Sequence, residues 1–264
     1  MSLGWLYRLD LWVVFLLTTA LFAISTEVGF RLGQRAEAKT PDSAKSHIGT
    51  LENAVLALLA LMLGFSFLMS LSRYDNRKEL VLAEANAIGT AYLRAQLLPP
   101  PHNEEIQKLL RNYVDVRLKY SAAGIDDTKL REASQETERL GRQIWSHAID
   151  LSAEGLRPDS VRLFIESMNE VLDLDEKRAM ALKDQVPATI YLILYTVAAI
   201  GFAFVGYSAG LSGHRHLLVT VLIVVLISSV ITLIADLDRP RRGLIKVSQQ
   251  SMIDLRESLD KENK

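Results

Sequence analysis

The chain has 264 residues, with 30 Lys and Arg against 31 Asp and Glu, and a formal net charge of −1 at pH 7. That balance excludes the basic excess typical of nucleic-acid-binding proteins, so we expect no nucleic-acid partner. The lack of cysteine excludes disulfide frameworks, thiolate metal sites and cysteine nucleophiles. Mean hydropathy is positive, and apolar residues gather in long runs near both ends while charges fill the middle. This segregation predicts a membrane protein.

Four apolar runs are long enough to cross the hydrocarbon core of a bilayer, which takes about 20 helical residues. They occupy residues 11–30, 54–72, 188–211 and 217–235. The first run could instead be a signal peptide, but its charged region is thin and no small-residue cleavage site follows. We therefore expect an all-α, polytopic membrane protein, with transmembrane helices 1 and 2 in residues 1–72 and helices 3 and 4 in residues 187–236.

Four crossings would place both termini and the long central segment on one side of the membrane. Lys and Arg close to the helix ends are more frequent on that side, which predicts that it is cytoplasmic. These residues are Arg8, Arg73, Arg77, Lys78, Lys177, Arg178, Lys183, Arg239, Arg241, Arg242 and Lys246, against Arg31, Arg35, Lys39, Lys45 and Arg215 on the other side. We expect a multi-pass protein of the bacterial inner membrane with cytoplasmic termini.

The central segment, residues 73–186, is expected to form a cytoplasmic helical domain, and residues 237–264 a cytoplasmic tail. The first helix of the central segment should stop at Pro99–Pro101, because proline lacks an amide donor and restricts the residue before it. Beyond the prolines, apolar residues recur at helical spacing. From Leu130 to Leu151 they alternate steps of three and four, which is a heptad-like seam. This pattern predicts long helices packed as a bundle.

Signatures of enzymes and metal sites are missing from the sequence. There is no phosphate-binding loop, nucleophile elbow or zinc-protease motif. The histidines are scattered, at His47, His102, His147, His214 and His216. We expect no catalytic activity, no metal site and no cofactor. Glu27, at the outer end of the first membrane helix, either marks an ion path or reaches head-group water.

Small residues and charges distinguish two of the membrane helices. Ala57, Ala60 and Gly64 form a small-residue stripe on the second helix, and Gly206 and Gly210 form a pair on the third, a pattern that favours close approach of helices in lipid. Charged residues at the end of the fourth helix could pair with each other or with Arg73, or bind anionic lipid head groups. Alternatively, they form only a stop-transfer cluster at the membrane interface. They are Asp236, Asp238, Arg239, Arg241 and Arg242.

Two stretches resemble a known family. They are LGFSFLMSLSRYDNRKELVLAEANAIGTAYLRAQLLP, from Leu63 to Pro99, and DLDRPRRGLIKVSQQ, from Asp236 to Gln250. Both are similar to the bestrophin-like family of membrane proteins, and the likeness in layout covers nearly the whole chain. The family is named for a distant similarity to bestrophins, which are pentameric anion-selective channels with four membrane helices per subunit and cytoplasmic termini. Their second helix lines the pore and forms an apolar neck.

The resemblance implies an oligomer, with a pentamer favoured, that conducts inorganic ions across the lipid bilayer. Matching Leu63-Gly64-Phe65 to the Leu-Gly-Phe of bacterial bestrophins places Phe65 at the inner end of the neck. A spacing of four back along the helix adds Leu61 and Ala57 to the same face. Arg73 matches the arginine of the bestrophin Asp-Arg-Trp-Trp stretch, where this chain has lost the acid and both tryptophans. Those losses leave the selected ion unassigned.

The sequence also leaves a second function open, in which the chain is a non-conducting membrane scaffold. Its helical cytoplasmic bundle would then bind a partner protein, and the heptad-like seam from Leu130 to Leu151 motivates that hypothesis. The second membrane helix discriminates between the two functions. A channel requires the neck residues for ion flux, whereas a scaffold does not.

Overall fold

The computed structural model describes residues 9–153 and 159–261, so Arg8 lies outside the described residues. Within these ranges every regular element is a helix, which confirms the all-α prediction. Four helical stretches are long and apolar enough to cross a membrane, namely Leu11–Lys39, Ser43–Ala95, Asp159–Leu211 and Leu217–Leu237, as expected for a polytopic membrane protein. The chain divides into two compact units. We call them the membrane unit (described residues up to 73, 185–239 and 243–245) and the polar unit (described residues of 74–184, 240–242 and 246–261).

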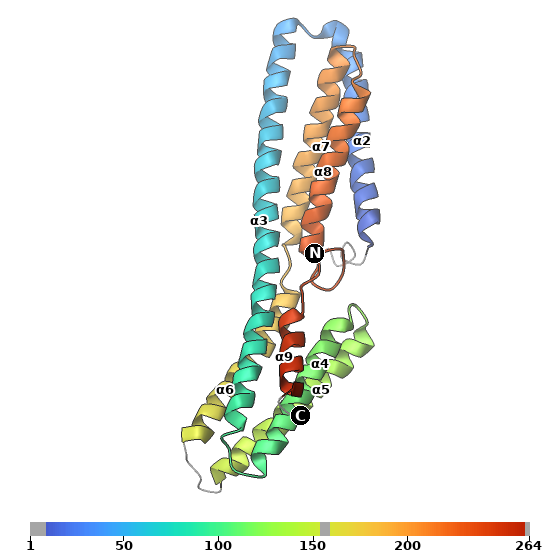
Figure 1. Cartoon of the computed structure of the whole chain (residues 1–264). Helices are drawn as coiled ribbons and strands as arrows, with labels where there is room; N and C mark the ends of the chain where they lie inside the picture. Colours follow the sequence, from blue (N-terminus) through green and yellow to red (C-terminus); the bar gives the residue numbers. More distant parts are fainter. Residues whose placement is uncertain (1–8, 154–158, 262–264) are drawn as a thin grey trace. The chain divides into compact units, whose positions relative to one another are not determined.

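The membrane unit contains α2 (Leu11–Ala36), the short helix η1 (Glu37–Lys39), the first part of α3 (Asp42–Ala95), α7 (Ala188–Leu211) and α8 (Leu217–Leu237). These helices run side by side in Figure 1. The apolar run at 54–72 is thus the middle of a much longer helix, which begins at Asp42. The residues between Asp42 and Asn53 include no proline, so nothing in them prevents the helix from extending beyond its apolar part.

Glycines on α2 and α7 bring these two backbones into direct contact. A Cβ atom at Gly29 or Gly33 would overlap a main-chain oxygen of α7, and one at Gly206 or Gly210 would overlap a main-chain oxygen of α2. The close approach predicted for the pair in α7 is therefore confirmed, although its partner glycines in α2 were not predicted. Side chains fill the rest of the interface, where the rings of Phe22 and Phe202 stack with their centroids 4.8 Å apart.

The polar unit contains the second part of α3, α4 (His102–Ala122), α5 (Asp127–Ala153), α6 (Asp159–Lys183) and α9 (Gln250–Lys261). Helix α3 ends at Ala95, just before the proline run, as the sequence predicts. The carboxylate of Asp126 caps the start of α5 by accepting the backbone N–H groups of Thr128 and Lys129. The hydrogen bond from Lys129 is the main cause that lowers the pKa of Asp126.

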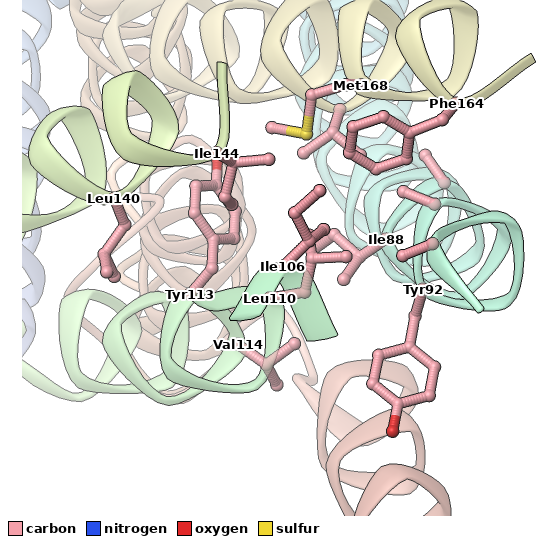
Figure 2. Close-up of a cluster of buried hydrophobic side chains, with 14 of the residues drawn as sticks. Ile88, Tyr92, Ile106, Leu110, Tyr113, Val114, Leu140, Ile144, Phe164 and Met168 are labelled. Atoms are coloured by element: carbon pink, nitrogen blue, oxygen red, sulfur yellow. The ribbon is translucent and has the colours of Figure 1, made fainter. Parts of the chain in front are cut away.

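The core of the polar unit is formed where the apolar faces of its helices meet (Figure 2). The predicted face of α4 packs in this core, and Ala133, Leu140, Ile144 and Leu151 of the heptad-like seam on α5 pack into the same core. Fully buried side chains include Ile88, Ile106, Leu110, Tyr113, Leu140, Ile144, Phe164 and Met168. The seam from Leu130 to Leu151 is therefore used inside the unit, and its core-facing residues are not an exposed surface for a partner protein.

Candidate functional site

The predicted neck residues share one exposed face of α3 within the membrane unit. Ala57 is exposed, and 56% of Leu61 and 63% of Phe65 are accessible. The opposite face of the helix contributes Leu59 and Leu63 to the core of this unit. Because the buried face fixes how the helix is rotated, the side chains of Ala57, Leu61 and Phe65 point away from the other described helices of the membrane unit.

The small-residue stripe of α3 lies on this exposed side as well. Ala60 is exposed, and a Cβ atom at Gly64 would meet no atom within 4 Å. This stripe therefore packs against no other helix among the described residues, in contrast to the glycines of α2 and α7. The uncovered face of α3, which we call the α3 face, consists of Ala57, Ala60, Leu61, Gly64 and Phe65.

Asp236 lies at the end of α8 and is almost fully buried. Its carboxylate accepts hydrogen bonds from the backbone N–H groups of Leu244 and Ile245, at 3.0 to 3.2 Å. Gly243 makes this loop possible, because its φ of +118° is in the left-handed region and a Cβ atom there would overlap the Asp236 carboxylate. Asp236 thus holds the segment that follows α8 against the end of that helix.

Asp238 and Arg239, also buried, bind other parts of the main chain. The Asp238 carboxylate accepts the N–H of Val186 at 3.0 and 3.1 Å, just before α7 begins, and Tyr191 donates its hydroxyl to it at 3.5 Å. Arg239 donates from Nη1 to the carbonyl oxygen of Leu9 at 2.7 Å. The charges at the exit of α8 therefore connect the entry to α2, the start of α7 and the end of α8.

Arg73, the last residue of α3 in the membrane unit, is partly buried and makes polar contacts of its own. The sequence left open whether the charges at the exit of α8 pair with each other, with Arg73 or with lipid head groups. The contacts described above place main-chain groups among the partners of Asp236, Asp238 and Arg239. Such contacts are worth most when they are buried, because an unpaired buried charge costs several kcal/mol.

The polar unit holds a buried ion network that the sequence analysis missed. Glu84 on α3 is fully buried and pairs with Arg117 on α4, at 2.7 Å between Oε1 and Nε, and with Arg178 on α6. Arg117 also contacts Asp175 on α6, at 2.6 Å between Nη1 and Oδ1. These residues tie three helices together. The sequence does contain a signal for a buried charge here, because Glu84 falls at helical spacing among the apolar residues of the buried face of α3, between Val81 and Ile88.

Burial shifts the protonation of two groups at this network. It raises the pKa of the Asp175 carboxyl, against the opposing field of Arg117, and it raises the pKa of the nearby Tyr113 hydroxyl. The Tyr113 hydroxyl has no hydrogen-bond partner among the described residues. The network thus pairs the carboxylates of Glu84 and Asp175 with the guanidinium groups of Arg117 and Arg178. The neighbouring Tyr113 hydroxyl is left without a hydrogen bond among the described residues.

Two of the scattered histidines come together in the polar unit. The Nδ1 atoms of His102 on α4 and His147 on α5 lie 3.1 Å apart, and Nε2 of His147 lies 3.5 Å from a carboxylate oxygen of Glu105. In the described ranges no group of three or more His, Asp or Glu side chains has the geometry to hold a metal ion. This pair therefore joins α4 to α5.

Comparison with known proteins gives both a family and a fold. The family model described as "Bestrophin-like domain" matches residues 16–252. Among solved structures, two variants of a bacterial bestrophin homologue from Klebsiella pneumoniae match with a TM-score of 0.65. One is 17% identical and covers 94% of this chain and 97% of its own, and the other is 18% identical and covers 96% and 98%.

A further structure of a Klebsiella pneumoniae bestrophin homologue, phased with zinc, has a TM-score of 0.63 at 18% identity and covers 94% of this chain and 96% of its own. A search of curated proteins found no match. At these identities the structural likeness establishes the fold alone.

Proposed function

We propose that this chain, which belongs to the Bestrophin-like family, is the subunit of a homo-oligomeric ion channel whose pore is lined by α3. The observation that carries the proposal is the α3 face, which includes Leu61 and Phe65 and which none of the described helices covers. Family membership supports the channel function, because bestrophins are ion channels. The sequence lacks the catalytic motifs named above, so the proposal includes no enzymatic activity.

A ring of subunits follows from this arrangement. The α3 face points away from the other described helices of its membrane unit, so several copies are needed to enclose an ion path along it. Closed symmetric rings are the ordinary way to do this, and the resemblance to bestrophins favours a pentamer. In such a ring the small residues Ala60 and Gly64 would allow neighbouring α3 helices to approach closely.

The neck would act through its lack of polarity. Rings of Leu61 and Phe65 side chains form a hydrophobic constriction, which blocks ions by excluding water until it widens. Ala57 would form a wider ring than either. An apolar neck discriminates little between ions by itself, so the proposal covers inorganic ions as a class.

The proposed location is the bacterial inner membrane, with both termini and the polar unit in the cytoplasm. The distribution of Lys and Arg supports this orientation. We favour the channel over the scaffold alternative, because Ala133, Leu140, Ile144 and Leu151 of the seam that motivated the scaffold pack in the core of the polar unit.

Ion flux through reconstituted protein tests the proposal. Wild type and Phe65→Ala are placed in liposomes under chloride or potassium gradients, after the mass of each oligomer has been measured. We expect Phe65→Ala to conduct faster than wild type, because a smaller side chain widens the neck. Leu222→Ala is the matched control, since Leu222 on α8 is also apolar and 60% exposed but lies on another helix. Well-formed oligomers that carry no flux in any variant would overturn the proposal.

A further inference from the structure

The polar unit contains a cavity of about 540 Å³ that the channel function does not use. It lies between α3, α4, α6, α9 and the segment before α9, and its lining includes the cationic side chains of Arg77, Arg178, Arg241 and Lys246. No Asp or Glu is among the described residues that line it. The cavity is therefore a pocket of one charge sign inside a chain whose net charge is close to zero.

Two of these cations are already engaged. Arg178 pairs with Glu84 and donates from Nη2 to Oε1 of Gln249 at 3.1 Å. Arg77 donates from Nε to the carbonyl oxygen of Ala181 and from Nη2 to that of Asp184, both at 3.1 Å. These contacts fix the two guanidinium groups and make the back of the cavity rigid.

The other two cations have no carboxylate partner in the part of the chain that the structure describes. The guanidinium of Arg241 lies over the ring of Tyr120, 4.4 Å from its centroid, so its position is fixed while its N–H groups remain available. Lys246 is exposed. Two uncompensated positive charges at one cavity match the charge of a single dianionic group, and guanidinium and ammonium groups both bind phosphate oxygens.

The size and lining of the cavity further restrict the chemical class of ligand that can bind. A volume of about 540 Å³ falls in the range of small-molecule pockets, and a single halide ion would leave most of it empty. Much of the remaining lining is apolar, with Leu80, Val81 and Ile253 among the residues. A ligand that fills the cavity therefore has a compact apolar part beside its anionic group.

We propose that this cavity binds a small organic anion that carries a phosphate group, held by Arg241 and Lys246 beside the fixed guanidinium groups of Arg77 and Arg178. The phosphate could belong to a soluble metabolite or to a lipid head group. In either case the ligand contacts helices α3 and α6 and the segment before α9 at once. Binding therefore stabilises the folded polar unit and couples these elements.

Thermal unfolding of the full-length protein in neutral detergent tests the site, with phenyl phosphate as the probe. We expect a saturable rise in Tm, with phenyl sulfate and benzoate at equal ionic strength giving much weaker effects because each is a monoanion. Arg241→Gln or Lys246→Gln should raise the phenyl phosphate concentration that gives half of the maximal Tm rise by roughly tenfold, since each removes one charge-assisted contact. Lys177→Gln is the control, because Lys177 is exposed in the same unit and does not line the cavity.

A second arm distinguishes the two sources of phosphate. The protein is placed in micelles that contain phosphatidic acid or phosphatidylcholine. Phosphatidic acid could raise Tm where phenyl phosphate and phosphatidylcholine do not, with the rise lost in Lys246→Gln and kept in Lys177→Gln. That result would assign the site to a lipid head group and still support the proposal. Equal shifts for all anions in all variants, or no shift with either phosphate source, would overturn it. Because Lys246 is exposed, its replacement leaves the fold intact and keeps the test valid.

Discussion

At the scale of single residues, the few charged side chains that are buried bind main-chain groups and other charges. Asp236, Asp238 and Arg239 hold three segments of the membrane unit through backbone groups. Glu84 does the equivalent in the polar unit by pairing with Arg117 and Arg178. Removing one member of such a buried pair leaves the other charge uncompensated, which is why these positions are expected to be intolerant of substitution.

The unsatisfied hydroxyl of Tyr113 gives a prediction of the opposite sign. Tyr113→Phe removes a buried donor without a partner and keeps the ring in place, so we expect it to raise stability by about 1 kcal/mol. Tyr92→Phe is the matched control, because the Tyr92 hydroxyl accepts a hydrogen bond from Arg111 at 2.9 Å and its loss should cost about 1 kcal/mol. Thermal unfolding in detergent measures both. A loss of stability in Tyr113→Phe would show that its hydroxyl has a partner.

At the scale of helices, α2 and α7 depend on glycine for their contact, whereas α3 does not. We expect Gly206→Ala to destabilise the membrane unit, because its methyl group would overlap the carbonyl oxygen of Thr26. Gly49→Ala on α3 is the matched control, because no atom lies within 4 Å of the new methyl group and alanine is the better helix former by about 1 kcal/mol. Thermal unfolding and the yield of folded protein should fall for Gly206→Ala alone. Equal losses in the two variants would contradict the account of this interface.

The same helices show what the sequence can and cannot predict. The membrane segments were predictable because a bilayer imposes a length and a polarity on any helix that crosses it. The start of α3 was not, because a helix can extend past its apolar part, and α3 begins at Asp42. The shared face of Ala57, Leu61 and Phe65 follows from helical spacing. That the chain itself leaves this face uncovered depends on the packing of the other helices.

Contacts between distant residues were the hardest to predict. Asp238 binds a backbone group 52 residues away, and Glu84 pairs with an arginine 94 residues away. Nothing in local spacing selects these partners, because they depend on which helices pack together. The burial of Glu84 among apolar residues was the one local signal, and it indicates a buried charge without naming what compensates it.

At the scale of the whole molecule, the proposed channel requires several copies of the membrane unit. A single chain exposes the α3 face together with apolar side chains of α2, α7 and α8. Exposure alone does not separate the surface that faces lipid from the surface that lines a pore. In a ring the two differ in one physical respect, because only the pore surface meets water when the channel opens.

The chain contains no cysteine, which makes one measurement direct. Single cysteines are placed at Leu61 or Phe65 on α3 and at Leu222 on α8, and ion flux in liposomes is recorded before and after a charged, water-soluble thiol reagent is added. All three positions are apolar and more than half exposed in one subunit. We predict that the reagent changes flux through Leu61→Cys and Phe65→Cys and leaves Leu222→Cys unaffected. Flux that changes only in Leu222→Cys, or in none of the three conducting variants, would contradict a pore lined by α3.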